Sequence, residues 1–186
     1  MTGRQLAALF AVAAGLSALC SCSVVPQVQR AFGGKGSYWH DTHTGGKAWM
    51  EVDLKRQVAA FYRGQNKMGV AAISSGDERH RTPDGTYRIL EKLKDKYSTL
   101  YGHVEDAHGS VVNRDATPAS RVPPGCRYVP APMPYWMRLT SSGIGMHQGF
   151  LPGYAASHGC IRMDKKVVRH FYDAAFVGMK VKVTGG

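Results

Sequence analysis

The sequence is poor in acidic residues and lacks any apolar run long enough to span a bilayer. Its 186 residues include 13 Asp and Glu against 24 Lys and Arg, a formal net charge of +11. The longest apolar run, residues 6–19, is shorter than the about 20 residues that a transmembrane helix needs. No internal repeat and no second domain are visible. The chain is therefore typical of one globular domain with short extensions.

The scarcity of negative charge favours a polyanionic partner, because a basic surplus attracts such partners over long distances. Nucleic acid, anionic lipid headgroups and an acidic cell-wall polymer all qualify, and net charge alone does not choose among them. The composition is otherwise ordinary for a soluble protein, with 44% apolar and 20% charged residues. The 22 Gly and 9 Pro favour a turn-rich β domain over a long helical bundle.

The N-terminal segment has the length and flanks of a secretory signal peptide. One charge, Arg4, precedes the apolar run 6–19, which ends at Leu19-Cys20-Ser21-Cys22. This ending resembles the bacterial lipobox, in which Leu and small residues precede a lipidated Cys, although Cys20 is an unusual residue at the intermediate position. We therefore expect residues 1–21 to be a lipoprotein signal peptide and Cys22 to be the lipidated N-terminus. The alternative is a simple signal peptide with incidental cysteines.

Few cysteines remain beyond this segment. Once Cys20 is removed and Cys22 is lipidated, Cys126 and Cys160 are the two possible thiols. One disulfide between them is compatible with an oxidising envelope, but a role of Cys160 as a nucleophile would require its thiol to be reduced. Residues 22–47 are polar and Gly-rich, which predicts a flexible tether. Within it, His40 and His43 lack further ligands and are interpreted as solvated loop histidines.

From residue 48 onward, short apolar segments separated by turns predict a single domain over 48–186. Period-two alternation and short apolar runs indicate strands, and Thr82-Pro83-Asp84-Gly85-Thr86 is a turn signal. The expected strands are 50–54, 58–62, 68–73, 87–90, 135–139, 144–147 and 179–183, with a hairpin within 101–112. Six prolines make 117–134 a loop, and we expect it to border the catalytic cleft together with 148–156. A helix is expected near Asp164, a plausible N-cap.

One stretch carries the chemistry, Met146-His147-Gln148-Gly149 continuing to Ser157-His158-Gly159-Cys160-Ile161-Arg162. A cysteine nucleophile needs a base and oriented N–H donors for the oxyanion. Gly159 leaves the backbone beside Cys160 uncrowded, and Cys160 lies just upstream of the expected helix, where positive partial charge favours a thiolate. A hairpin-like loop over 148–156 is expected to bring His147 and Cys160 together.

Ser-His-Gly-Cys-Ile-Arg with an upstream His resembles the signature of the L,D-transpeptidase (YkuD-like) catalytic domain. The resemblance extends over roughly residues 48–184, including the Thr-Pro-x-Gly turn at 82–85 and the closing strand. It implies a mostly β fold with minor α, a single compact β-sandwich or mixed-sheet domain with one helix after the catalytic Cys. Two departures are the short gap between His147 and Cys160 and the Arg162 found where many members have Asn.

The resemblance also implies site roles. Cys160 matches the nucleophile and His147 the base. The main-chain carbonyl of Gln148 would orient His147, His158 and Gly159 match the oxyanion-hole wall, and Ser157 and Arg162 match positions that shape the site or bind substrate. His158 has an alternative role as a hydrogen-bonded core residue. A zinc site from His147, His158 and Cys160 lacks a recognised ligand spacing, so neither a metal nor another cofactor is expected.

The implied function is peptidoglycan L,D-transpeptidation. Cys160 would attack the stem tetrapeptide at its third residue, release D-Ala, and pass the acyl group from a thioester to an acceptor amine. We expect a monomer in the cell envelope or periplasm, lipid-anchored to a membrane through Cys22. The alternatives are an L,D-carboxypeptidase and a catalytically idle wall-binding lipoprotein. A nucleic-acid-binding role is not favoured, because the basic residues are scattered and an export signal is present.

Overall fold

A computed structural model describes residues 36–41 and 45–186. The signal peptide 1–21, the lipidation site Cys22, His43 and most of the tether lie outside the described residues. The described part is mostly β, with one helix and a curled mixed sheet, and this confirms the fold class predicted from sequence. None of its helices is long and apolar enough to cross a membrane.

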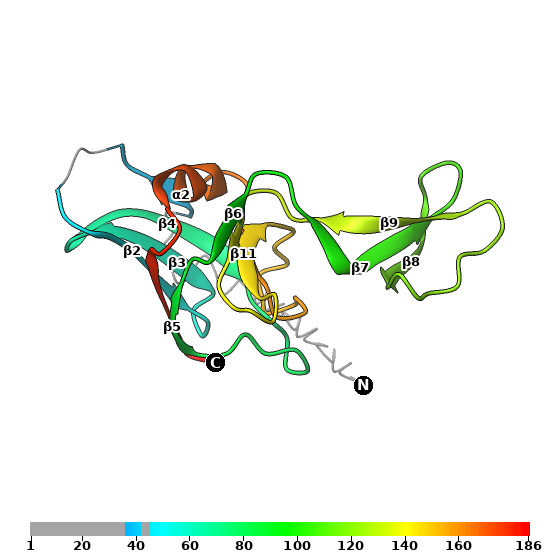
Figure 1. The fold of residues 1–186 in the computed structure, drawn as a ribbon, viewed down its shortest axis with the longest axis horizontal. Coiled ribbons are helices and arrows are strands. Elements are labelled where there is room, and N and C mark those ends of the chain that lie inside the picture. Colours follow the sequence, from blue (N-terminus) through cyan, green and yellow to red (C-terminus); the bar gives the residue numbers. More distant parts are fainter. Residues whose placement is uncertain (1–35, 42–44) are drawn as a thin grey trace, which may run out of the picture.

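Ten strands form the body of the molecule, in the order β5-β13-β2-β3-β4-β12-β11-β10-β6, with β1 paired to β4. Figure 1 shows this sheet curling around the core, with the helix α2 against it. The body consists of β1 (Tyr38–Trp39), β2 (Ala48–Asp53), β3 (Val58–Arg63), β4 (Asn66–Ser74), β5 (Gly85–Arg88), β6 (Glu91–Leu93), β10 (Trp136–Arg138), β11 (Gly145–Gln148), β12 (Ile161–Met163), α2 (Val168–Ala174) and β13 (Lys180–Thr184).

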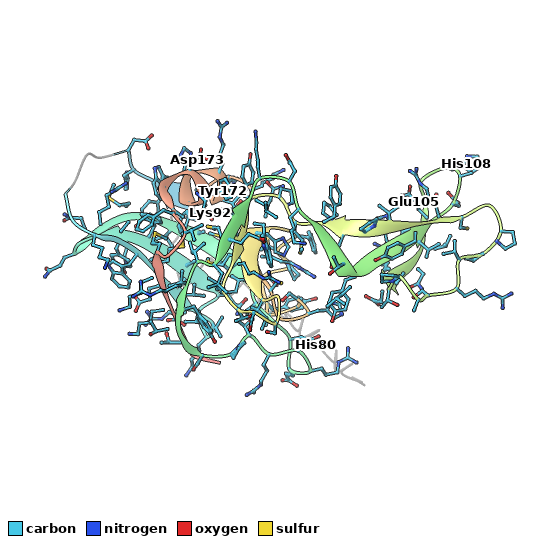
Figure 2. All side chains as sticks on the ribbon, viewed as in Figure 1. His80, Lys92, Glu105, His108, Tyr172 and Asp173 are labelled. Atoms are coloured by element: carbon cyan, nitrogen blue, oxygen red, sulfur yellow. The ribbon has the colours of Figure 1, made fainter. Side chains whose placement is uncertain are left out.

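The core lies on the inner face of this sheet, as the period-two alternation requires. In β2, Met50 and Val52 are buried and their neighbours are partly exposed. Phe171 and Val168 of α2 join the same cluster and are fully buried. Burying each such side chain stabilises the fold by about 1.5–3 kcal/mol. Lys92 ties β6 to this helix, since its Nζ lies 4.3 Å from the ring centre of Tyr172 (Figure 2).

The helix begins later than the sequence suggested. Val168 is its first residue, and no side chain caps its N-terminus. Asp164 instead starts the preceding turn, where its Oδ1 accepts the Lys166 N–H and its carbonyl accepts the Val168 N–H. Strand β12 lies between Cys160 and the helix. The partial positive charge of the helix N-terminus is therefore not next to Cys160, contrary to what the sequence had suggested.

A second, three-stranded sheet projects from the body as an arm (Figure 1). Its order is β8-β7-β9, formed by β7 (Tyr97–Glu105), β8 (Val111–Ala116) and β9 (Arg127–Pro132). The expected hairpin within 101–112 is confirmed as β7 and β8. The prediction that all of 117–134 is loop was wrong, because β9 lies within it. Two prolines of β9 are tolerated because β9 is an edge strand.

The connection between β11 and β12 also differs from expectation. These strands are parallel, with Met146 opposite Ile161 and His147 opposite Arg162. A hairpin joins antiparallel strands, so residues 149–160 are a crossover that returns the chain to the start of β12. The predicted hairpin-like loop was therefore wrong.

Two residues within the expected tether pack against the body. Tyr38 and Trp39 pair with Val70 and Gly69 of β4. The Trp39 ring contacts the ring of Phe61, with their centres 5.2 Å apart. At these residues the chain is docked onto the domain.

Candidate active site

The strand register places the predicted catalytic side chains on one face of the sheet. Met146, Ile161 and Met163 point into the core, so their neighbours His147 and Arg162 point to the opposite face. Cys160 directly precedes Ile161 and lies beside Gly145, whose main-chain N–H acts to lower the pKa of the thiol. His147 and Cys160 are thus diagonal neighbours on adjacent strands. The structure brings them together through strand pairing.

His147 is held by its own strand. Its Nδ1 lies 2.7 Å from the carbonyl oxygen of Gln148, and because that oxygen only accepts, Nδ1 carries the proton. Nε2 of the neutral ring is therefore the basic atom. The Gln148 carbonyl is fixed in turn, since the Gln148 N–H bonds the Pro134 carbonyl and the Gly149 N–H bonds the Met163 carbonyl.

Burial has the largest effect on the pKa of His147. The side chain is only 7% exposed, and burial lowers its pKa to about 4, assisted by the positive charge of Arg162 and opposed by the Gln148 bond. The indole of Trp136 covers it, with ring centres 6.1 Å apart. Gly145 leaves room for this indole, because a Cβ at residue 145 would lie 2.6 Å from it.

Cys160 is a free thiol, as is Cys126, so the two do not form a disulfide. Burial raises the pKa of the Cys160 thiol, while the Gly145 N–H and the charges of Arg162 and Lys96 act in the opposite direction. The Sγ lies 3.7 Å from the Gly143 carbonyl, which accepts from the thiol. The resting pair is therefore a thiol and a neutral imidazole.

The guanidinium of Arg162 has no hydrogen bond or ion pair to any residue of 36–41 or 45–186. The side chain is half-buried, and its aliphatic part covers Gly149, where a Cβ would lie 2.8 Å from Cγ. Its charge acts on both Cys160 and His147. A half-buried cation without an acidic partner among these residues lowers stability.

The loop that carries Cys160 is fastened to the segment 75–82. The Ser75 carbonyl accepts the N–H groups of Ala156 and Ser157, and the Asp77 N–H bonds the Ser157 carbonyl. Ser157 is 2% exposed, and its hydroxyl donates to the Cys160 carbonyl and accepts the Gly159 N–H. This hydroxyl is thus engaged with the main chain of the loop. Gly159 has φ +104, a conformation that favours glycine.

His158 is exposed and does not occupy the core, so the core alternative was wrong. Its ring stacks on Tyr101 of β7 at 4.3 Å between centres and contacts His80 at 4.7 Å. His80 lies on the loop at the lower edge of the body (Figure 2). Its Nδ1 is 3.0 Å from Asp77 Oδ1. His158 therefore joins the Cys160 loop to the base of the arm.

The segments 117–134 and 148–156, which were both expected to border the cleft, lie in different parts of the molecule. Pro134 contacts β11 through its bond with Gln148. Residues 117–126 lie on the arm instead, away from β11 (Figure 1). The crossover 149–160 passes the end of β4, where the Ser74 hydroxyl donates to the Tyr154 carbonyl.

Sequence reasoning missed Tyr101, Trp136 and Thr82 as parts of this site. No local sequence pattern distinguishes Tyr101 and Trp136 from aromatic residues that only pack in a core. Thr82 was assigned only to a turn. Its hydroxyl donates to the Gly159 carbonyl over 2.7 Å, a contact across 77 residues of sequence.

Comparisons with known proteins agree on one family. The sequence model of the L,D-transpeptidase catalytic domain, YkuD, matches residues 47–183. An L,D-transpeptidase from Mycobacterium smegmatis has a similar fold, with TM-score 0.55, 21% identity, and coverage of 76% of this chain and 60% of that one. For the enzyme from Stackebrandtia nassauensis the values are 0.57, 17%, 86% and 65%.

A further L,D-transpeptidase, solved in complex with imipenem, has TM-score 0.57 and 20% identity over 76% of this chain and 60% of that one. At these identities the likeness establishes the fold. The chain spans less than two thirds of the length of each of these structures. No curated protein matches the chain.

Proposed function

The chain belongs to the family of L,D-transpeptidase catalytic domains, and we propose that it is a peptidoglycan L,D-transpeptidase with Cys160 as nucleophile and His147 as base. The observation that carries the proposal is the fixed tautomer of His147, whose Nδ1–H bonds the Gln148 carbonyl on the face that also carries Cys160. This carbonyl takes the place of the acidic residue of other triads.

The first half-reaction forms a thioester. Nε2 of His147 takes the Cys160 proton as Sγ attacks the carbonyl carbon of the third stem residue. The negative oxygen of the tetrahedral intermediate accepts hydrogen bonds from the main-chain N–H groups of His158 and Cys160, because the Gly159 N–H is engaged with the Ser157 hydroxyl. When the intermediate collapses, the C–N bond to the terminal D-Ala breaks, and the imidazolium returns the proton to the departing amine.

The second half-reaction reverses these steps with a new amine. The amine of a second stem attacks the thioester carbonyl, His147 takes its proton, and the C–S bond breaks to restore the Cys160 thiol. Water in place of the amine gives an L,D-carboxypeptidase, so the two activities differ only in the acceptor. An idle wall-binding lipoprotein is disfavoured by the complete Cys–His pair.

Two further residues are assigned supporting roles. Arg162, whose guanidinium lacks an acidic partner in the described chain, binds a carboxylate of the stem peptide beside Cys160. Ser157 shapes the loop, since its hydroxyl bonds the main chain at Gly159 and Cys160. His158 and Gly159 form the wall of the oxyanion site.

Imipenem tests the nucleophile directly, because a β-lactam carbonyl acylates a reactive thiol. We expect intact-protein mass spectrometry to show one adduct on the wild type and none on Cys160→Ala. Cys126→Ala is the matched control and should retain the adduct, since Cys126 is a second free thiol. An adduct that persists in Cys160→Ala overturns the assignment. Mass analysis of muropeptides incubated with the protein then distinguishes cross-linked products from hydrolysed ones.

The membrane anchor is a separate part of the proposal. It is supported by the sequence Leu19-Cys20-Ser21-Cys22 after an apolar run. Cys22→Ala should leave the protein soluble in the periplasm or unprocessed with its leader attached. Cys20→Ala is the control and should remain membrane-bound. Unchanged fractionation and mobility of Cys22→Ala would contradict lipidation.

A further inference from the structure

Thr82 joins the turn that follows β4 to the loop that carries Cys160. It is 4% exposed, its hydroxyl donates to the Gly159 carbonyl over 2.7 Å, and its oxygen accepts the Gly76 N–H over 2.9 Å. We propose that Thr82 is a positioning residue for the oxyanion site, holding the peptide group whose N–H stabilises the negative oxygen. This inference rests on the proposed acyl transfer at Cys160.

The argument depends on which peptide group Thr82 holds. The carbonyl of Gly159 and the N–H of Cys160 belong to the same planar peptide unit, and the described residues contain no cis peptide bond. In a trans unit the C=O and N–H point in opposite directions. A hydroxyl that fixes the Gly159 oxygen therefore fixes the direction of the Cys160 N–H, which is a donor to the oxyanion in the proposed mechanism.

This restraint matters because Gly159 has no side chain to limit the rotation of its backbone. Its φ of +104 lies in a region open to glycine, and a Cβ there would meet nothing closer than 3.7 Å. Gly159 is buried, and the Ser157 hydroxyl bonds the peptide groups on either side of this one, but Ser157 makes no hydrogen bond to the Gly159 carbonyl. The Thr82 hydroxyl supplies the missing restraint from a different part of the chain.

Thr82 is itself held in place. The Gly76 N–H points at its oxygen, and the loop 76–82 closes so tightly that a Cβ on Gly76 would lie 1.9 Å from the His80 carbonyl. Two hydrogen bonds join the Gly76 N–H, the Thr82 hydroxyl and the peptide group of Gly159 C=O and Cys160 N–H into one chain. Such chains polarise one another, so the Cys160 N–H becomes a stronger donor when the Thr82 bond is present.

Thr82→Val tests this role because it keeps the shape of the side chain and removes the hydroxyl. Two rates are measured on the reduced, folded protein. Acylation by imipenem passes through an oxyanion, whereas alkylation of the thiol by iodoacetamide does not. We expect Thr82→Val to slow acylation by about tenfold or more, a smaller effect than the roughly 100-fold loss of a direct donor. Alkylation and its pH profile should stay at wild-type values.

Three variants complete the design. Thr82→Ser keeps a hydroxyl and should restore most of the acylation rate. Thr184→Val is the matched control, since Thr184 also donates to a main-chain oxygen, that of Val52, on β13. If Thr82→Val does not fold, Thr82→Ala removes the same hydroxyl with less bulk, and the same pair of rates decides.

The outcomes distinguish a failure of the proposed function at Cys160 from a failure of the positioning role of Thr82. Absence of acylation in the wild type overturns the proposed function. Wild-type acylation with an equal rate in Thr82→Val overturns the positioning role alone. An equal loss of acylation and alkylation also overturns it, because that pattern reports general damage to the site around Cys160.

Discussion

At the scale of single residues, the balance of effects on His147 determines how the site works. Burial disfavours the imidazolium, and the Gln148 carbonyl favours it by accepting the Nδ1 proton. Burial is the larger effect, so the pKa falls to about 4. The ring is therefore neutral at neutral pH and ready to accept a proton at Nε2. Because burial also raises the pKa of the Cys160 thiol, proton transfer accompanies the attack on substrate in the proposed mechanism.

The pH dependence of acylation follows from this state. The rate of imipenem acylation of the wild type should be flat between about pH 5 and pH 7, because His147 is already deprotonated there and its pKa is about 4. His147→Ala removes the base, so its slower acylation should rise about tenfold per pH unit with the thiolate fraction. Stopped-flow or quenched single-turnover measurements give both profiles. A wild-type midpoint near pH 6.5 would contradict the buried, neutral ring.

The same residue should affect stability. The folded pKa of His147 is below its ordinary 6.5, so the unfolded chain binds the extra proton first. The contribution of His147 to stability is therefore complete above about pH 6.5 and is lost as pH falls towards 4, by about 2–3 kcal/mol at pH 4.5. Urea unfolding at pH 7 and pH 4.5 measures this loss. His147→Gln should show a correspondingly smaller loss than the wild type. Equal losses would indicate that His147 is accessible to solvent.

The residues of the site differ in how far the sequence could predict them. His147, Cys160 and the carbonyl of Gln148 follow from a compact motif, because each lies within or beside it. Trp136 and Thr82 reach the site through strand pairing and a long-range hydrogen bond. Their neighbours in sequence carry no sign of these contacts, so only the folded arrangement identifies them.

At the scale of the elements, the alternation of apolar and polar residues predicted the strands better than it predicted which strands pair with each other. β2, β3 and β4 were found from apolar patterns that the shared core explains. β9 was missed because prolines count against a strand, yet an edge strand tolerates them on its unpaired side. The parallel pairing of β11 and β12 was missed because the intervening Gly and Pro suggested a tight return. A crossover connection and a hairpin loop have similar local amino-acid composition, so the sequence did not distinguish them.

Docking of β1 offers a test at this scale. A Cβ on Gly69 would lie 2.5 Å from the Trp39 ring, which packs against Phe61 and the helix residue Phe171. Gly69→Ala should therefore displace Trp39 and destabilise the domain by about 2 kcal/mol. Gly45→Ala is the matched control, since a Cβ there meets nothing within 4 Å. Chemical denaturation of both variants measures the effect. Equal stability of the two would show that β1 is not docked in solution.

At the scale of the whole molecule, charge is distributed unevenly between body and arm. The arm strands and their connections, residues 97–132, contain Arg114, Arg121 and Arg127, offset by three carboxylates that include Glu105. Glu105 also pairs with Arg127 within the arm sheet, and lies with His108 far from the body (Figure 2). The basic surplus of the described chain therefore belongs to the body, which also carries Cys160.

Under the proposed function, this distribution predicts that the basic body binds a polyanionic cell wall. Attraction between exposed charges is screened over about 10 Å at 0.1 M salt and about 3 Å at 1 M. Co-sedimentation with purified sacculi should therefore fall when the added salt is raised from roughly fivefold below to roughly fivefold above 0.1 M, while acylation by imipenem changes little. Two double variants test where the charges act, and all four residues are exposed. Lys165→Glu with Lys166→Glu reverses two body charges, and Arg114→Glu with Arg121→Glu reverses two arm charges. The body pair should weaken co-sedimentation more than the arm pair does. Both pairs change the net charge equally, so the comparison reports position alone. Equal weakening by the two pairs would mean that total charge, and not a basic body presenting the Cys160 site, governs contact with the wall.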